Sequence, residues 1–390
     1  MEKQIYLDNA STTKLSDKVF QLTADTIDKI YANPDSLHAL GLATERQMEL
    51  ARDSIAVSLN AKSEEIIFTS SGTEANNLAI FGAAEAQKRK GNKIISTNAE
   101  HPSVYFPMLE LEKRGFEVAY LSTQNGKIDM GEFKSQLDEK VVLVSAMLVN
   151  NETGSIFDIS KIAKTIETSG LSPYVHCDAV QAYGKLPIDL NKLKIDLMSL
   201  SAHKIHGPKG CGALFLRKGK RIVPQIYGGG QEKGLRSSTL NTPGIFAFGK
   251  AAKEAFTHLE QNNKHIEILY DHTAEKIREK CPGIIFNQFN QSENANISKY
   301  IMSLRLPDIK SEVMLNYLSA RGIYISSGSA CSEKRQNSKE SKRVLLNYGL
   351  DKNSADFTIR VSFSKYNTTE EIDEFVEALA EGISRLAVVL

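Results

Sequence analysis

EIIFTSSGTEANNLA, residues Glu65–Ala79, is the stretch that decides the fold. Three apolar residues and a β-branched one come first, a Ser-Ser-Gly turn follows, and a helix-forming run closes it. Strand, turn and helix in this order favour a parallel α/β architecture, where the N–H groups and dipole of the helix start bind anions. Gly72 lets the backbone approach a ligand, and Thr73 adds a hydroxyl. A plain helix cap fits the same pattern.

Strand and helix patterns alternate from residue 66, within this stretch, to about residue 217. Seven strands are expected: Ile66–Thr69, Lys93–Thr97, Glu117–Leu121, Val141–Val149, Tyr174–Cys177, Leu197–Ser201 and Gly212–Leu216. Helices are expected at Glu74–Lys88, Val104–Arg114 and Ile159–Ser169. The alternation predicts one large α/β domain, with a mostly parallel seven-stranded sheet covered by helices on both faces.

A smaller α+β domain is expected beyond Gly244, where the sequence pattern changes. Its expected elements are a long helical stretch, two strands around a helix, a further strand and a closing helix: Pro243–Lys280, Tyr300–Arg305, Ser311–Ala320, Ile323–Ser326, Phe357–Ser364 and residues from Thr369 onward. We place the large domain at residues 15–255 and the small one at residues 1–14 and 256–390. The first dozen residues are too short to fold alone, and the pattern leaves open which domain they pack on.

Composition and charge argue against several classes of protein. Lys and Arg number 48 against 47 Asp and Glu, so the net charge of +1 gives no reason to expect a nucleic-acid partner. No apolar run reaches the roughly 20 residues of a membrane span, and the start lacks the pattern of a secretory signal. The four cysteines, at positions 177, 211, 281 and 331, lack C-x-x-C spacing. We expect a cytoplasmic protein with free thiols and neither metal nor membrane partners.

Lys204 follows a buried strand in SLSAHKIHGPKGCG, residues 199–212. An aldehyde cofactor needs such a lysine, partly desolvated and with a lowered pKa, for covalent attachment. A lone lysine is more often a surface cation, but His203 and the Gly-Pro pair that flank this one favour the cofactor.

Two other strand ends carry polar residues. Asp178 closes the strand in YVHCDAVQ, residues 174–181, at the edge where open α/β sheets bind ligands. An acid there keeps a pyridine nitrogen protonated, although a helix cap is the alternative. His101, in residues 98–103, follows another strand end and is placed to stack on a ring and move protons near neutral pH. A structural histidine is its alternative.

Cys331 lies in ISSGSACSEKRQNSKES, residues 325–341, a turn of small residues followed by a charged stretch. Buried structural cysteines do not usually have such surroundings. A thiol on a flexible arm can reach both an active site and an outside acceptor. Because a thiol with a pKa of about 8.5 is mostly protonated at neutral pH, a nearby group must activate it. An ordinary exposed thiol is the alternative.

Seven motifs then occur in order: Tyr6–Thr13, Ser70–Glu74, Ala99–His101, Val149–Gly154, His203–Gly210, Arg236–Thr239 and Ser326–Cys331. Together they resemble the cysteine desulfurases of the nitrogen-fixation and iron–sulfur-cluster assembly type, in the class V aminotransferase superfamily. The match runs nearly end to end, as far as the strand Ile359–Ser362. The resemblance implies the pyridoxal-phosphate-dependent transferase fold of type I.

The resemblance also implies a role for each residue. Lys204 would carry pyridoxal phosphate, Cys331 would take up sulfur as a persulfide, and His101 would stack on the ring and serve the acid–base steps. Asp178 would contact the pyridine nitrogen of the cofactor, and Gln181 would contact its phenolic oxygen. The cofactor phosphate would be bound by Gly72, Thr73, Ser201, His203 and, from the neighbouring subunit of a homodimer, Thr239. The substrate carboxylate would be bound by Asn151, which also contacts the cofactor, and by Arg360, for which a strand ion pair is the alternative.

The implied reaction converts L-cysteine to L-alanine and passes sulfur through Cys331 to an acceptor, an iron–sulfur scaffold or a tRNA-thiolation enzyme. Selenocysteine lyase, cystine lyase and aminotransferase are alternative reactions within the superfamily, and a catalytically silent scaffold that keeps the fold and binds partners is an alternative of a different functional class. Cys331 favours the desulfurase, because transamination has no use for a thiol. Two features depart from the family pattern: Ser238 replaces a usual glycine, and the residues after Cys331 are bulkier and more charged.

Overall fold

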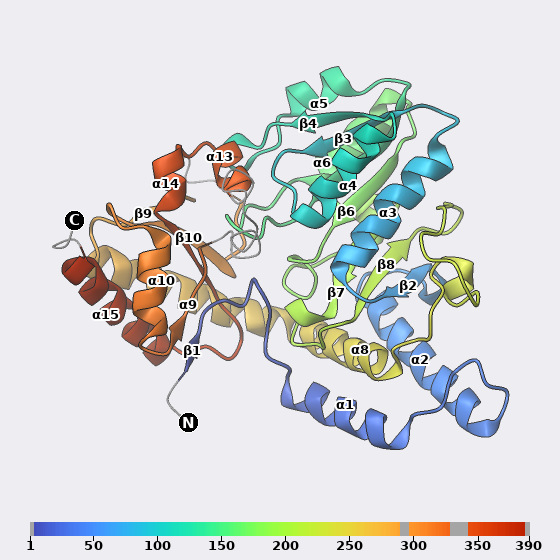
Figure 1. Ribbon diagram of the computed structural model, residues 1–390, viewed down its shortest axis with the longest axis horizontal. Helices are drawn as coiled ribbons and strands as arrows, with labels where there is room; N and C mark the ends of the chain where they lie inside the picture. The colour runs from blue at the N-terminus through green and yellow to red at the C-terminus, as the bar shows by residue number, and fades with distance from the viewer. Residues whose placement is uncertain (1–3, 289–295, 328–341, 387–390) are drawn as a thin grey trace.

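The computed structural model describes residues 4–288, 296–327 and 342–386, and its larger part is built on one seven-stranded sheet (Figure 1). The strand order is β2-β8-β7-β6-β5-β3-β4, with β8 antiparallel to both neighbours and the other pairs parallel. The strands are β2 Ile66–Thr69, β3 Lys93–Thr97, β4 Glu117–Leu121, β5 Val141–Met147, β6 Tyr174–Asp178, β7 Leu197–Ser201 and β8 Gly212–Leu216. The predicted α/β class and mostly parallel sheet are confirmed.

Two strand ends differ from the prediction at the edge that matters for function. Strand β5 ends at Met147 rather than Val149, because Leu148 and Val149 turn away to pair with Phe157 and Ile156. Strand β6 runs one residue further than expected, to Asp178. Asp178 is therefore the last residue of β6, and Asn151 follows the end of β5.

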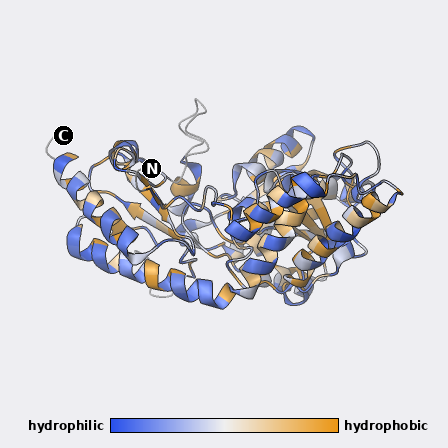
Figure 2. Cartoon of the chain, turned by 90° about the horizontal axis from the view of Figure 1, so that it is seen from below, coloured by the Kyte–Doolittle hydropathy of each residue, from blue (hydrophilic) through white to orange (hydrophobic). Residues whose placement is uncertain are grey.

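Each face of this sheet carries its own apolar cluster, because successive side chains point to opposite faces. Ile66 and Phe68 belong to one cluster and Ile67 to the other. Helices α2 (Ala39–Val57), α6 (Ile159–Ser169) and α8 (Thr242–Thr257) cover the first face, and α3 (Gly72–Gln87) and α4 (Pro102–Lys113) cover the second. Figure 2 shows the hydrophobic strands enclosed by helices whose outer faces are largely hydrophilic.

The predicted helical stretch Pro243–Lys280 is helical in the structure, but it is broken once. It is two helices, α8 and α9 (Leu259–Lys280), separated at His258, whose φ of −111° and ψ of 17° lie outside the helical range. The break has a packing reason: α8 buries alanines such as Ala251 against the large sheet, while α9 buries Leu269 in a separate core.

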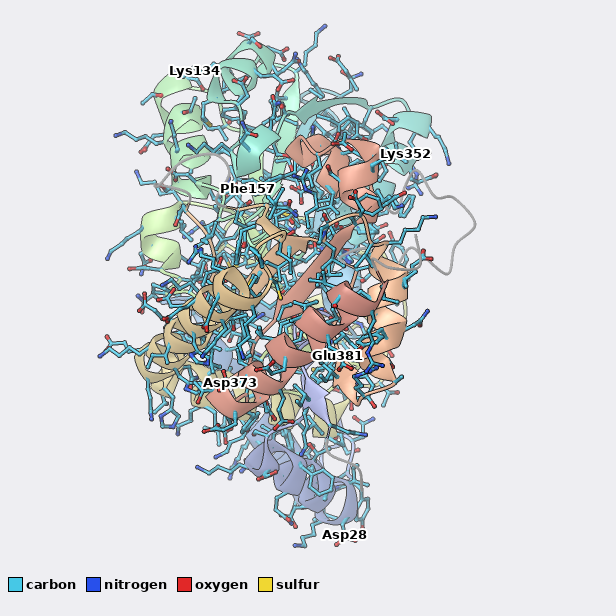
Figure 3. All side chains as sticks on the ribbon, turned by 90° about the vertical axis from the view of Figure 1, so that its left-hand side faces the viewer. Asp28, Lys134, Phe157, Lys352, Asp373 and Glu381 are labelled. Atoms are coloured by element: carbon cyan, nitrogen blue, oxygen red, sulfur yellow. The ribbon has the colours of Figure 1, made fainter. Side chains whose placement is uncertain are left out.

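The smaller part surrounds an antiparallel sheet of order β12-β10-β9, with β12 Thr358–Ser362, β10 Ile301–Arg305 and β9 Ile285–Phe286. Helices α10 (Ser311–Ser319), α13 (Arg343–Tyr348), α14 (Lys352–Asp356) and α15 (Thr369–Leu386) complete it. Figure 3 shows Asp373 and Glu381 on α15. Asp373 pairs with His272 of α9 at 2.8 Å, and Glu381 pairs with Arg321 at 3.7 Å.

The first residues of the chain pack on this smaller part. Strand β1 (Ile5–Tyr6) pairs in parallel with β11 (Ile323–Tyr324), and Asn9 donates through Nδ2 to the carbonyl of Ser362 at 2.9 Å. Together with the break at His258, this pairing supports our division into residues 15–255 and residues 1–14 with 256–390, which we retain as a proposal.

The unpredicted elements include α1 (Asp17–Lys29) and α2, which pack on α8, and the short helices α5 (Met130–Gln136) and α7 (Leu190–Leu193). Across the described ranges, no helix has both the length and the apolar character needed to cross a bilayer.

Candidate active site at the carboxyl edge of the sheet

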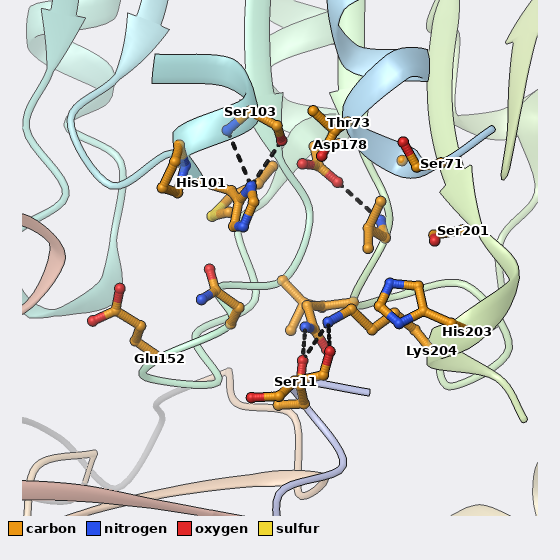
Figure 4. A pocket seen from close by; sticks show the side chains of 18 of the residues that line it. Ser11, Ser71, Thr73, His101, Ser103, Glu152, Asp178, Ser201, His203 and Lys204 are labelled. Carbon is orange, nitrogen blue, oxygen red and sulfur yellow. Dashed lines mark hydrogen bonds between the residues drawn. The ribbon is translucent and has the colours of Figure 1, made fainter. Parts of the chain in front are cut away.

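A cavity of about 250 Å³ lies where the carboxyl ends of the parallel strands meet the N-terminal segment and β12. Its wall includes ten residues that the sequence analysis singled out: Gly72, Thr73, His101, Asn151, Asp178, Gln181, Ser201, His203, Lys204 and Arg360. Figure 4 shows Ser71, Ser201 and His203 on one side, His101 and Glu152 on the other, and Asp178 and Lys204 between them. Cys331 lies outside the described residues.

The start of α3 forms one wall, and its geometry explains Gly72. A Cβ on this residue would come within 2.6 Å of Val180 Cγ2 and 3.3 Å of Ser201 Cβ. Glycine therefore allows the helix start to lie directly against the ends of β6 and β7. Ser71 caps the helix, and its hydroxyl accepts the N–H of Glu74 at 3.1 Å. The Ser201 hydroxyl is buried, and no described residue hydrogen-bonds to it.

Asp178 is held at the end of β6 by two donors. Its Oδ1 accepts the N–H of Val180 at 2.9 Å, and its Oδ2 accepts Asn76 Nδ2 at 2.8 Å. Burial raises the pKa of Asp178, while these hydrogen bonds and the charge of Lys204 oppose the rise. Residues 180–185 form turns, so Asp178 does not cap a helix, and that alternative is excluded.

His101 lies at the start of α4 as a neutral imidazole. Its Nδ1 accepts the N–H of Ser103 at 3.1 Å, which places the ring proton on Nε2. Burial, then the charges of Lys204 and Arg343, lower the pKa of His101 to about 4. The sequence had led us to expect a histidine that titrates near neutral pH, whereas in the structure the lowered pKa keeps the ring neutral, with an Nε2–H group that can donate a hydrogen bond.

Lys204 lies in the short turn after β7, and its Nζ donates to the carbonyl oxygens of Ala10 and Ser11, each at 2.6 Å. His203 beside it contacts Thr12 Oγ1 through Nδ1 at 3.1 Å, and burial lowers the pKa of His203 to about 3. The N-terminal segment, whose motif was noted without a role, therefore forms the wall opposite Asp178.

Arg360 reaches the cavity from β12 and joins both parts of the chain. Its Nη2 binds Asp8 Oδ1 at 2.8 Å and Ser11 Oγ at 2.7 Å, and its Nη1 donates to the carbonyl of Asn151 at 2.9 Å. The ion-pair alternative is thus correct in part. Arg360 Nε and Asn151 Oδ1 are both buried and lack a hydrogen-bond partner among the described residues, which leaves polar atoms for a ligand.

Comparison with known proteins agrees with this geometry. The class-V aminotransferase family matches residues 5–375. A cysteine desulfurase IscS from Clostridium botulinum is 37% identical over 99% of this chain and 96% of its own length. Another, from Ehrlichia chaffeensis, is 39% identical over 98% of this chain and 92% of its own. The chain belongs to the cysteine desulfurases of the class-V aminotransferase family.

Solved structures agree with this assignment. A NifS-like protein superposes on this desulfurase with a TM-score of 0.90 at 35% identity, covering 98% of this chain and 100% of the other. SspA in complex with cysteine superposes with a TM-score of 0.81 at 30% identity, covering 94% and 100%. The enzyme depends on pyridoxal phosphate, as predicted.

The cavity of the desulfurase fits this cofactor. The start of α3, the unpaired Ser201 hydroxyl and His203 make an anion site on one side, as a phosphate requires. Asp178 offers a fixed carboxyl for the pyridine nitrogen, and Lys204 offers the amine. These groups come from the ends of three strands: the start of α3 follows β2, Asp178 ends β6, and Ser201, His203 and Lys204 lie at the end of β7 and in the turn after it. The sheet brings these three ends together.

Thr239 is the one predicted site residue within the described ranges that does not line the cavity. It is exposed, beyond a turn that Arg236 ties to α3 through a pair of hydrogen bonds to Glu74, at 2.7 and 3.2 Å. Ser238, which replaces the usual glycine, has a φ of +156°, a value that glycine adopts more easily.

Sequence reasoning missed Glu152, which lines the cavity and is 7% exposed. Its Oε2 has no hydrogen-bond partner among the described residues, and burial raises its pKa to about 8, with Arg360 and Arg343 opposing. The residue stood within the quoted Val149–Gly154 motif, but no pattern in the sequence signals that its carboxyl is buried. Asn76 and Ser103 were missed for the same reason.

Proposed function

We propose that this desulfurase converts L-cysteine to L-alanine and passes the sulfur through a persulfide on Cys331. The observation that carries the proposal is the convergence of Lys204, Asp178 and a proton-bearing His101 on one cavity, in a chain of this family. The relatives named cysteine desulfurase favour this reading over selenocysteine lyase, cystine lyase or aminotransferase. They also argue against a silent scaffold.

Arg360 and Asn151 would bind the substrate carboxylate. Arg360 Nε has no hydrogen-bond partner among the described residues, and the bonds to Asp8 and to the Asn151 carbonyl fix the plane of its guanidinium. A planar group fixed in this way suits bidentate recognition of a carboxylate.

Bound pyridoxal phosphate supplies an electron-withdrawing ring that stabilises negative charge on the substrate carbon next to it. Asp178 would keep the proton on the ring nitrogen, since its two hydrogen bonds favour the ionised carboxyl. Lys204 Nζ would take the proton from the substrate Cα. His101 would stack on the ring and direct its Nε2–H as a hydrogen-bond donor toward the substrate sulfur, and it would act in the acid–base steps only where the bound cofactor and substrate raise its pKa.

Cys331 would accept the sulfur directly from the substrate. The substrate Cβ–S bond breaks, an S–S bond forms at Cys331 Sγ, and Cβ takes up a proton, so one cysteine and one thiol give one alanine and one persulfide. The persulfide then passes to an acceptor, for which we propose an iron–sulfur scaffold or a tRNA-thiolation enzyme.

The chain on both sides of Cys331 supports this role. Five residues before it, Ser326 pairs with Arg360 in the cavity wall, at 3.1 Å and 2.6 Å. Twelve residues after it, Arg343 donates to the carbonyls of Asn98 and Glu100, beside His101. Five extended residues span up to roughly 17 Å, so the thiol can reach the cavity from Ser326.

A homodimer would complete the cofactor site. Large apolar side chains are exposed on α1, on α2 and between them, with Leu37 93% exposed: Phe20, Ile27, Tyr31, Leu37, Leu40 and Leu50. Large apolar side chains exposed together on neighbouring helices are a feature of protein–protein interfaces. We propose a second copy of the chain as its partner, which would bring Thr239 to the phosphate site of that copy.

We place the enzyme in the cytoplasm. Cys177, Cys211 and Cys281 are buried and free of disulfides, as in proteins of reducing compartments.

Two substitutions and a control test this function. Lys204→Ala should abolish the yellow colour of the bound cofactor and all alanine formation. Cys331→Ala should keep the colour but lose sulfide release in the presence of a reducing thiol. Cys281→Ala removes a buried thiol outside the cavity wall and should behave like the wild type. Sulfide release by Cys331→Ala at the wild-type rate would refute the persulfide role.

A further inference from the structure

Lys185 is a buried cation that none of the roles above uses. It lies in the turns after β6, four residues beyond Gln181, and is 6% exposed. It lines a small second cavity together with Lys204, and its Nζ lies 5.5 Å from the centre of the Tyr300 ring. Burying a lysine is costly unless the ammonium group makes compensating contacts, so a buried lysine beside an active site calls for an explanation.

The polar contact of Lys185 is with Gln181, a wall residue of the main cavity. Lys185 Nζ donates to Gln181 Oε1 at 3.0 Å, and Gln181 Nε2 donates to the carbonyl of Ala10 at 2.8 Å. Flipping the amide would set Nε2 against the Lys185 ammonium and Oε1 against the Ala10 carbonyl, two repulsive contacts. The amide therefore has a single favourable orientation, which leaves the second N–H of Nε2 for a ligand.

The charges around Lys185 are mostly positive. Lys204 faces it from the turn after β7 and Arg360 from β12, and His206 and Lys365 line the same small cavity. Burial, followed by the charges of Lys204 and Arg360, lowers the pKa of Lys185 to about 7. The charge of Lys185 in turn contributes to lowering the pKa of His203. The surroundings therefore disfavour the charged form of Lys185, and the favourable polar contact of its Nζ is the hydrogen bond to Gln181 Oε1.

We propose that Lys185 is a positioning residue for the cofactor: by hydrogen-bonding Gln181 Oε1 it holds the Gln181 amide with one N–H available to the phenolic oxygen of pyridoxal phosphate. This inference rests on the proposed function, in which Gln181 binds that oxygen. It adds that the donor is correctly oriented because of a buried lysine that need not touch the cofactor.

The consequence is measurable in the titration of the Lys204-bound cofactor. The proton shared between Lys204 Nζ and the phenolic oxygen leaves as the pH rises, and negative charge remains on the oxygen. An N–H donor stabilises that charge and so lowers the pH midpoint of the visible absorption band. Loss of the donor should raise the midpoint by about one unit, the size expected for one hydrogen bond to a charged group.

The test is a titration of the visible band in four variants of the holoenzyme: Lys185→Met, Lys185→Gln, Gln181→Met and the double variant Lys185→Met/Gln181→Met. Lys185→Met removes the hydrogen bond that orients the Gln181 amide, so the Gln181 N–H no longer stabilises the charge on the phenolic oxygen and the midpoint should rise by up to about one unit. Lys185→Gln keeps a neutral donor and should stay closer to the wild type, and it serves as the second reading if Lys185→Met does not fold. In the Gln181→Met background, Lys185→Met should add no further shift, because Lys185 acts through Gln181.

The outcomes separate this inference from the function on which it rests. An unchanged midpoint in Lys185→Met, or full additivity of the two shifts, overturns the positioning role while leaving the cofactor assignment intact. An unchanged midpoint in Gln181→Met overturns the assigned contact of Gln181, and the inference with it. A wild-type protein that develops no visible band with pyridoxal phosphate overturns both.

Discussion

Asn76→Ala should weaken cofactor binding, although Asn76 is not in the wall of the cavity. The side chain is 1% exposed, and its Nδ2 donates both hydrogens, to Asp178 Oδ2 and to Ser103 Oγ, each at 2.8 Å. Ser103 Oγ in turn lies 2.7 Å from His101 Nδ1. One amide therefore orients both the carboxyl proposed for the ring nitrogen and the hydroxyl beside the stacking histidine.

The magnitude follows from the number of hydrogen bonds. Asp178 accepts two from the described residues, and the substitution removes one. A hydrogen bond to a charged group contributes about 1.5–3 kcal/mol, which corresponds to a rise of about one to two units in the pKa of Asp178. We expect the dissociation constant of pyridoxal phosphate to rise about tenfold to a hundredfold.

The assay is a fluorescence or absorbance titration of cofactor-free protein with pyridoxal phosphate, at a pH where the wild type is saturable. Asn77→Ala is the matched control, because Asn77 is the next residue of the same helix and its side-chain amide donates to the Thr73 carbonyl instead of to Asp178. A dissociation constant for Asn76→Ala within threefold of the wild type, or an equal loss in Asn77→Ala, would contradict the reasoning.

Two further predictions concern stability. Glu232→Ala should lower the free energy of unfolding in denaturant by about 3–5 kcal/mol, because it removes the carboxylate that pairs with the buried Arg52 guanidinium and accepts the Phe68 N–H. Glu49→Ala, at the exposed side of the same arginine, should lower it by about 1 kcal/mol or less. Equal losses in the two variants would refute the prediction. In cofactor-free protein, Glu152 has a pKa raised to about 8, so its share of stability is present below pH 4.5 and is lost as the pH rises. Between pH 6.5 and 8 the free energy of unfolding of the wild type should therefore fall by about 2 kcal/mol more than that of Glu152→Gln. If the two proteins lost stability in parallel over this range, Glu152 would be ionised in the folded state.

The strands could be predicted closely because buried parallel strands are short, continuous apolar runs with clear ends. Helix α2 could not, since polar or small residues such as Gly41, Thr44 and Arg52 interrupt its buried face and weaken its apolar pattern. The break at His258 was missed because both halves are good helices, and only the two separate cores require the chain to change direction.

Some residues of the site could likewise be predicted from the sequence, and others could not. Residues just after strand ends, such as Asp178 and Lys204, could be placed because topology alone brings them to one edge. Asn76, Glu152 and Lys185 could not, because their importance comes from being buried with particular partners, and burial of a polar side chain leaves no local pattern. The roles of Thr239 and Cys331 stay predictions that rest on the resemblance.

We propose above all that the amine of Lys204 and the thiol of Cys331 act on the same molecule of L-cysteine. The most direct measurement is a single turnover with L-cysteine, followed by alkylation and mass spectrometry of the peptide that contains Cys331. The peptide should gain one sulfur atom for each alanine formed, and Lys204→Ala should give neither product. Alanine formed without sulfur on Cys331, or sulfur loaded in Lys204→Ala, would contradict it.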